Sequence, residues 1–164
     1  MKCPIYGMEM IEGGLIINGV APGWVPMEQF QKKDTLYLAD PVMGDQGKFY
    51  SMVSGEFLEG MRKLSQMADV ITPNLTELCF LSDVDYESVI ANRQKEDYLE
   101  QMKGLCEKIL SKAKKPQTVI VTGILREKEK RDYIGNLVVS KDQCFYMETP
   151  YTGMGFSGTG DLFA

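Results

Sequence analysis

The last dozen residues of the sequence, GMGFSGTGDLFA, contain two patterns that can each bind phosphate. Gly153, Gly155 and Gly158 fit the G-x-G-x-x-G spacing of dinucleotide-binding loops. Gly158-Thr159-Gly160-Asp161 instead reads as a glycine turn that brings a carboxylate to the start of a helix. The first pattern indicates a nicotinamide or flavin cofactor. The second indicates phosphoryl transfer with an aspartate as the base.

The position of the glycines favours the second pattern. A dinucleotide fingerprint follows the first strand of a βαβ unit and needs an acidic residue about 20 positions further on. Here the glycines follow a predicted hairpin, and no residues remain to supply that acid. In the second pattern, the backbone N–H groups of Gly158, Thr159 and Gly160 form an anion site, and Asp161 accepts the proton of an attacking alcohol.

Three further polar clusters follow predicted strands. Carboxyl ends of parallel strands meet at one edge of a sheet, where ligands of open α/β proteins bind. Each cluster alone is also explained by a turn, a helix cap or a strand exit. Their carboxylates are suitable oxygen donors for Mg²⁺, directly or through water. The clusters are Asp40 with Asp45, Thr72 and Asn74 with Glu77, and Thr122-Gly123.

The elements that position these clusters alternate along the chain. Strands are predicted in TLYLAD (35–40), DVIT (69–72) and TVIVTG (118–123). Helices are predicted after Ser54, after Asn74 with Glu77 completing a capping box, and from about Asp97 to Lys114. The segments DYIGNLVVS and QCFYMETP form a predicted antiparallel pair. The fold class is therefore α/β, a mostly parallel sheet with helices on both faces.

Residues 1–34 lack a sustained helical or strand period and are predicted to be an irregular segment before a domain at 35–164. Within them, a short strand at 14–18 and a helical turn near 27–31 are predicted.

Composition excludes several classes of function. A net charge of −5 and a pI of about 4.9 argue against nucleic acid or an anionic membrane as the main partner. The chain has no histidine, and its four cysteines are scattered without a C-x-x-C pair, so we expect no structural zinc site and no imidazole mechanism. We expect reduced, mostly buried thiols and, since no apolar run approaches a membrane span, a cytoplasmic protein.

Four motifs in a fixed order resemble one family. DPVMGD, ITPNLTEL, VIVTG and GTGDLFA, within roughly 35–164, are similar to pyridoxal kinases of the ribokinase superfamily. Hydroxymethylpyrimidine kinases look similar here, although DPVMGD with TPN favours vitamin B6 kinases. The resemblance implies a ribokinase-like fold and ATP-dependent phosphorylation of the 5′-hydroxymethyl group of pyridoxal, pyridoxine or pyridoxamine. It also implies Mg²⁺ and a monovalent cation such as K⁺. Without the family's opening strands, the apolar strands TLYLAD and TVIVTG would be left exposed, so we expect a homodimer.

The resemblance also implies roles for individual residues. Asp161 matches the catalytic base, and Gly158, Thr159 and Gly160 match the anion hole for the transferred phosphoryl group. The remaining matches concern the nucleotide and the cations. Asp40, Asp45 and Glu77 match acidic positions around the metal and the ATP phosphates, Thr72 and Asn74 lie near the monovalent cation and the nucleotide, and Thr122 and Gly123 touch ATP.

The resemblance further implies strands and helices before residue 35 and a long helix after the GTGD turn. We therefore expect this chain to be an incomplete kinase domain, truncated at both ends. An inactive remnant that keeps a nucleotide site or acts through protein contacts is the alternative from another class of function.

Overall fold

The computed structural model describes residues 13–17, 22–26, 36–51, 53–128 and 130–153. The chain divides into two units, Met1–Tyr37 and Leu38–Ala164. In the first unit, β1 (Gly13–Ile17) and β2 (Pro22–Pro26) form an antiparallel pair. β1 contains most of the strand predicted at 14–18. β2 was not predicted, because its prolines and glycine are residues that sequence patterns assign to turns. The helical turn predicted near 27–31 lies outside the described residues.

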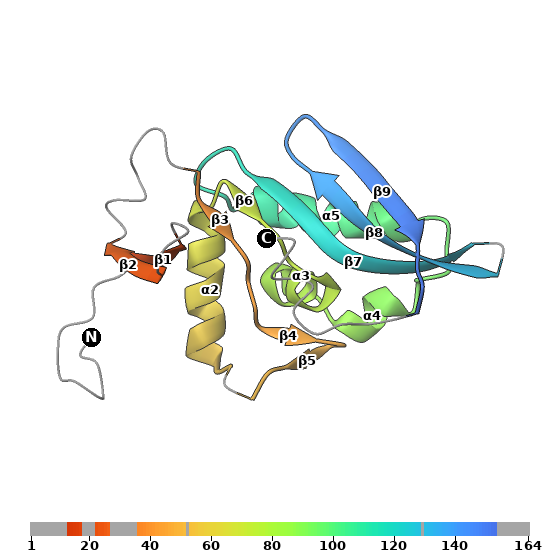
Figure 1. Cartoon of the computed structure of the whole chain (residues 1–164), viewed down its shortest axis with the longest axis horizontal. Coiled ribbons are helices and arrows are strands. Elements are labelled where there is room, and N and C mark those ends of the chain that lie inside the picture. Colours follow the sequence, from red (N-terminus) through yellow and green to blue (C-terminus); the bar gives the residue numbers. More distant parts are fainter. Residues whose placement is uncertain (1–12, 18–21, 27–35, 52, 129, 154–164) are drawn as a thin grey trace. The chain divides into compact units, whose positions relative to one another are not determined.

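The second unit contains the five-stranded sheet in the order β3-β6-β7-β8-β9 (Figure 1). β3, β6 and β7 are parallel, whereas β7, β8 and β9 are antiparallel neighbours. The predicted α/β class, with an antiparallel pair after the parallel strands, is confirmed. The parallel part is shorter than predicted, since β3 and β6 have two residues each. The strands are β3 (Leu38–Ala39), β6 (Val70–Ile71), β7 (Thr118–Lys128), β8 (Arg131–Val139) and β9 (Cys144–Pro150).

β7 does not end at Gly123 as the sequence pattern predicted. It continues to Lys128 through a register shift between Val121 and Ile124. Gly123 lies in this irregularity with a φ of 67°, a conformation that glycine adopts at little cost. The Thr122-Gly123 pair is therefore a bulge inside a long strand.

The helices confirm the predicted caps. Ser54 Oγ accepts a hydrogen bond from Phe57 N at 3.2 Å at the start of α2 (Gly55–Met67). Asn74 and Glu77 form the predicted capping box of α3 (Leu75–Ser82). The short α4 (Tyr86–Ile90) follows, and α5 (Tyr98–Leu110) begins after Asp97. α3 packs against α2, α5 and β7, and α5 also packs against β8.

The two faces of the sheet differ in exposure. Val119, Val121, Leu137 and Val139 are at most 2% exposed and alternate with residues on the opposite face. On that opposite face, Ile120, Val138 and Phe145 are aligned across three strands, and Phe145 is 45% exposed. The face with Phe145 therefore presents apolar side chains that the described residues do not fully cover.

Two further expectations concern the cysteines and the membrane. Cys79 and Cys106 are buried and Cys144 is exposed, and all three are free thiols. Among the helices in the described ranges, none combines the length and apolar character needed to cross a membrane.

Candidate functional site

Three of the predicted polar clusters lie side by side, at the carboxyl ends of β3 and β6 and at the bulge within β7. Thr72 Oγ1 donates a hydrogen bond of 3.1 Å to Asp40 Oδ1, which joins the segments after β3 and β6. Thr122 N donates to the carbonyl oxygen of Pro73 at 2.9 Å, and Asn74 forms a parallel bridge with Thr122. The bulge of β7 is thus attached to the segment that precedes α3. Hydrogen bonds and backbone pairing therefore join Asp40, Thr72–Asn74 and Thr122 into one continuous edge of the sheet.

Glu77 is the most buried carboxylate of this edge, at 4% exposure. Its Oε1 accepts a hydrogen bond from Met43 N at 3.0 Å, and its Oε2 accepts one from Asn74 N at 2.9 Å. Asn74 Oδ1 in return accepts from Glu77 N at 3.0 Å. Glu77 therefore caps its own helix and also fixes the loop after Asp40.

The loop after Asp40 forms a hairpin that the sequence analysis missed. β4 (Gly44–Asp45) pairs with β5 (Lys48–Phe49) around a two-residue turn. Gln46 and Gly47 in the turn have φ values of 49° and 76°, as type I′ hairpin turns require. The pattern D-Q-G is a weak hairpin signal. Strands of two residues also give no alternation to detect.

The hairpin is held on the first turn of α3. Asn74 Nδ2 donates to the carbonyl oxygen of Gly44 at 3.0 Å, and Gly47 N donates to Thr76 Oγ1 at 3.0 Å. Asp45 Oδ1 accepts from Gln46 N at 2.9 Å, and the Asp45 side chain is exposed.

Apolar contacts support the far side of the hairpin. Phe49 stacks on Phe80 of α3, with ring centroids 3.7 Å apart. Tyr50 follows β5, and burial together with the charges of Asp45 and Glu77 raises the pKa of its phenol. Tyr50 was not predicted from the sequence, yet its phenol lies within electrostatic range of both carboxylates.

Asp40, Asp45 and Glu77 are the carboxylates at this edge that could hold a metal ion. Within the described ranges, no three Asp, Glu, Cys or His side chains converge on one point. Mg²⁺ in phosphate-handling sites is commonly held by one or two carboxylates together with substrate phosphates and water. Asp40 and Asp45 fit that arrangement. Both oxygens of Glu77 already accept backbone hydrogen bonds, so Glu77 suits a contact through water.

The remaining predicted residues, Gly158, Thr159, Gly160 and Asp161, lie outside the part of the chain that the structure describes. Their convergence with the edge at Asp40 stays a prediction.

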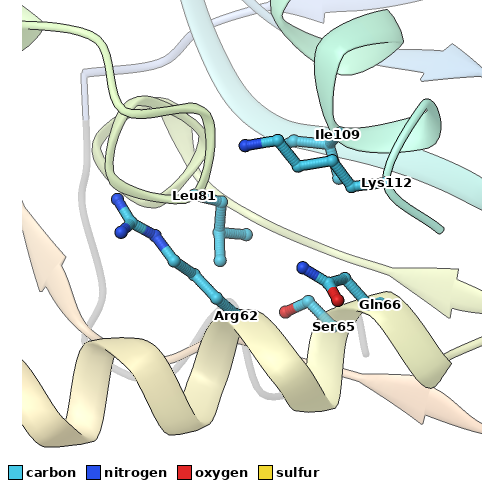
Figure 2. A pocket seen from close by; sticks show the side chains of 6 residues that line it. All are labelled: Arg62, Ser65, Gln66, Leu81, Ile109 and Lys112. Carbon is cyan, nitrogen blue, oxygen red and sulfur yellow. The ribbon is translucent and has the colours of Figure 1, made fainter.

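Two hollows away from this edge do not suit a nucleotide. A cavity of about 30 Å³ lies between α2, α3 and α5 (Figure 2), room for a water or two. A larger hollow of about 330 Å³ is lined by Phe49, Phe80 and the carboxylate residues Asp83 and Asp85. Arg62 also lines this hollow but already pairs with Glu59 and Asp83, so the two carboxylates leave it unsuited to phosphates. Neither hollow includes a predicted site residue, so the strand-end edge remains the candidate site.

Burial, which outweighs the hydrogen bonds from Asn74 and Met43, raises the pKa of Glu77 from 4.5 to about 7, and the charge of Asp40 adds to this rise. At pH values between 4.5 and about 7, Glu77 then holds its proton in the folded protein but loses it in the unfolded chain. The free energy of unfolding should therefore fall as the pH rises through this range. We expect Glu77 to contribute a fall on the order of 1–3 kcal/mol over this window. Urea unfolding at a series of pH values measures it.

Glu77→Gln is the control for this pH dependence, because the amide cannot ionise. The variant should lose the Glu77 part of the pH slope, whatever its stability at a single pH. An identical slope in the variant and the wild type would contradict the raised pKa.

Comparison with known proteins supplies the family context of this edge. The sequence pattern of the phosphomethylpyrimidine kinase family matches residues 10–164 and so begins before residue 35. A pyridoxal kinase of Corynebacterium diphtheriae is 26% identical, over 93% of this chain and 50% of its own length. A pyridoxal kinase of Rubrobacter xylanophilus is 27% identical, over 93% of this chain and 49% of its own length. The chain thus spans about half the length of the curated relatives it matches.

Solved structures show the same fold. A Bacteroides thetaiotaomicron protein crystallised with pyridoxal is 34% identical, with a TM-score of 0.66 over 83% of this chain and 45% of its own. The pyridoxal kinase of Leishmania donovani in complex with ADP and pyridoxine is 25% identical, with a TM-score of 0.60 over 83% of this chain and 41% of its own.

Proposed function

Because this chain belongs to the phosphomethylpyrimidine kinase family and has the ribokinase-like fold of pyridoxal kinases, we propose that it is the nucleotide-binding part of a pyridoxal kinase. Such an enzyme transfers the γ-phosphoryl group of ATP to the 5′-hydroxymethyl group of pyridoxal, pyridoxine or pyridoxamine. The observation that carries the proposal is the hydrogen-bonded edge formed by the ends of β3 and β6 and the bulge within β7. Two solved relatives support it, one holding ADP with pyridoxine and one holding pyridoxal.

The chemistry follows from the residue types at this edge. In phosphoryl transfer the protein mainly positions groups and neutralises charge. Asn74 at the start of α3 and the bulge at Thr122 and Gly123 would lie against ATP. Gly158, Thr159 and Gly160 would hold the transferred phosphoryl group, and Asp161 would accept the proton of the 5′-hydroxyl.

The cations of the site are part of the same proposal. Asp40 and Asp45 would hold Mg²⁺, with Glu77 acting through water, and Thr72 would lie near a monovalent cation such as K⁺. When bound, Mg²⁺ would neutralise charge on the ATP phosphates.

A hydroxymethylpyrimidine kinase is the second candidate, and the description of the matching family favours it. Both reactions phosphorylate a hydroxymethyl group on a nitrogen heterocycle, so the proposed base and anion hole serve either substrate. An inactive remnant that retains the nucleotide site is the third.

The test is to incubate the purified chain with ATP and Mg²⁺ and to offer pyridoxal and hydroxymethylpyrimidine in parallel. We expect ATP-dependent formation of pyridoxal 5′-phosphate, with binding of ADP measured separately by calorimetry. Formation of only the pyrimidine phosphate would support the second candidate. ADP binding without either product would support the remnant, and no ADP binding would contradict a nucleotide site.

We also propose that the chain forms a homodimer and works in the cytoplasm. The partly exposed apolar face with Phe145 and Met147, 45% and 57% exposed, supports self-association. The free thiols of Cys79 and Cys106 suit a reducing compartment. Sedimentation at micromolar concentration should show a dimer that Phe145→Lys weakens. A stable monomer would contradict the dimer.

A further inference from the structure

The first turn of α3 holds the β4–β5 hairpin through three side chains, and one of them has no assigned role. Asn74 and Glu77 belong to the proposed nucleotide and metal site. Thr76 does not. Its Oγ1 accepts the Gly47 amide hydrogen bond at 3.0 Å across 29 residues of sequence. Its side chain is nearly inaccessible, at 2% exposure. We propose that Thr76 is a positioning residue that fixes Asp45 at the edge where the nucleotide phosphates bind, an inference that rests on the proposed function.

The backbone geometry of the hairpin explains why this bond matters. Asp45 pairs with Lys48, so Gln46 and Gly47 are the two central turn residues. In such a turn the ladder bonds use the flanking residues, and the amide of the second central residue has no partner inside the hairpin. Thr76 supplies that partner. A part-buried amide without one would be costly.

The hydrogen bond between Gly47 and Thr76 restrains Asp45 through the turn residues. Asp45 Oδ1 accepts a hydrogen bond from Gln46 N at 2.9 Å, so the carboxylate is fixed relative to the turn. The hydrogen bond that Thr76 accepts from Gly47 fixes this turn relative to α3. The hydrogen bond from Asn74 to Gly44 anchors only the first strand of the hairpin.

The apolar contacts of the hairpin cannot replace the Thr76 bond. Phe49 stacks on Phe80, and Gly47 lies against the Tyr86 ring so closely that an added Cβ would be 2.6 Å from Tyr86 Cδ1. Such contacts press the hairpin onto α3 and α4 but are non-directional, so they tolerate small sliding motions. The hydrogen bond to Thr76 sets the position of the turn.

The experiment compares Thr76→Val, which keeps the shape and removes the acceptor, with Thr76→Ser, which keeps the hydroxyl. In Thr76→Val, amide exchange of Gly47 measured by NMR should accelerate roughly tenfold, and Mg²⁺-dependent ADP affinity should fall roughly tenfold. Thr76→Ser should restore both. Thr118→Val is the matched control, because Thr118 is the first residue of β7 and precedes the bulge that belongs to the site. This variant should change neither the amide exchange of Gly47 nor the ADP affinity.

The outcomes separate the positioning role from the proposed function. Unchanged Gly47 exchange in Thr76→Val overturns the inference, because the bond then does not hold the turn. Faster exchange with unchanged ADP affinity overturns the positioning role alone and leaves the proposed function standing. A wild-type chain that binds no ADP overturns the proposed function and the positioning role with it. If the purified chain is catalytically active, the KM for ATP should rise in Thr76→Val while the KM for the vitamer stays constant.

Discussion

Asp161→Asn is expected to lower the rate of phosphoryl transfer by about 10² to 10⁴, the usual effect of removing a general base. The asparagine side chain has nearly the same shape but cannot accept the proton of the attacking hydroxyl. ADP affinity should stay within about twofold of the wild type, because the backbone and side-chain groups at the ends of β3 and β6 and at the bulge within β7 are proposed to hold the nucleotide. Single-turnover formation of pyridoxal 5′-phosphate and calorimetric ADP binding measure the two quantities.

Asp142→Asn is the matched control, since it removes the same charge from an exposed residue between β8 and β9. Its rate and affinity should match those of the wild type. Near-full turnover in Asp161→Asn would show that the base lies elsewhere. A loss of ADP binding equal to the loss of rate would instead place Asp161 among the groups that hold the nucleotide.

Local sequence signals predicted the parts of the site that local interactions build. The capping box of Asn74 and Glu77 needs residues three apart, so both members are visible in one short stretch. The N-cap Ser54 is recognised in the same way. The polar residues after β3 and β6 were assigned to one edge because parallel strands impose it, and the bond between Thr72 and Asp40 joins these two strand ends.

The sequence did not reveal interactions between residues far apart in the chain. Glu77 meets Met43 across 34 residues and Thr76 meets Gly47 across 29. Neither pair has a periodic pattern or a composition signal, since one partner in each is a backbone amide that any residue supplies. Glu77 was therefore predicted as a capping residue and as a candidate metal ligand, but the hydrogen bond that its carboxylate accepts from Met43 N was not predicted.

The strand pattern of TVIVTG failed for a related reason. Gly123 looked like a strand terminator, because glycine in the interior of a strand weakens that strand. Pairing with β8 resumes after the bulge, with Ile124 opposite Gly135, and carries β7 on to Lys128. Tertiary pairing thus overrides the local signal and leaves Thr122 and Gly123 in an irregular segment, next to Asn74.

Gly44→Ala is expected to disrupt the hairpin that carries Asp45. A Cβ at this buried position would lie 2.2 Å from the Lys48 carbonyl oxygen and 3.1 Å from Phe49 Cα, both backbone atoms of the paired strand. Backbone cannot rotate away as a flexible side chain can, so β4 and β5 must separate. We expect the free energy of unfolding to fall by about 1–3 kcal/mol, as for other overpacked sites. Mg²⁺-dependent ADP affinity should fall by about tenfold or more, because Asp45 moves with the hairpin.

Gly104→Ala makes the same chemical change where no atom obstructs it. Gly104 lies inside α5, and beyond the backbone of its own helix an added Cβ would have no described atom within 4 Å. Because alanine favours the helix over glycine, this variant should be more stable by about 0.5–1 kcal/mol and bind ADP normally. The opposite signs of the two changes in unfolding free energy separate the steric demand at Gly44 from a general effect of adding a methyl group. Suppose that Gly44→Ala had the unfolding free energy and the ADP affinity of the wild type. The close pairing of β4 with β5 would then not be required for nucleotide binding, and Asp45 would not depend on that pairing for its position.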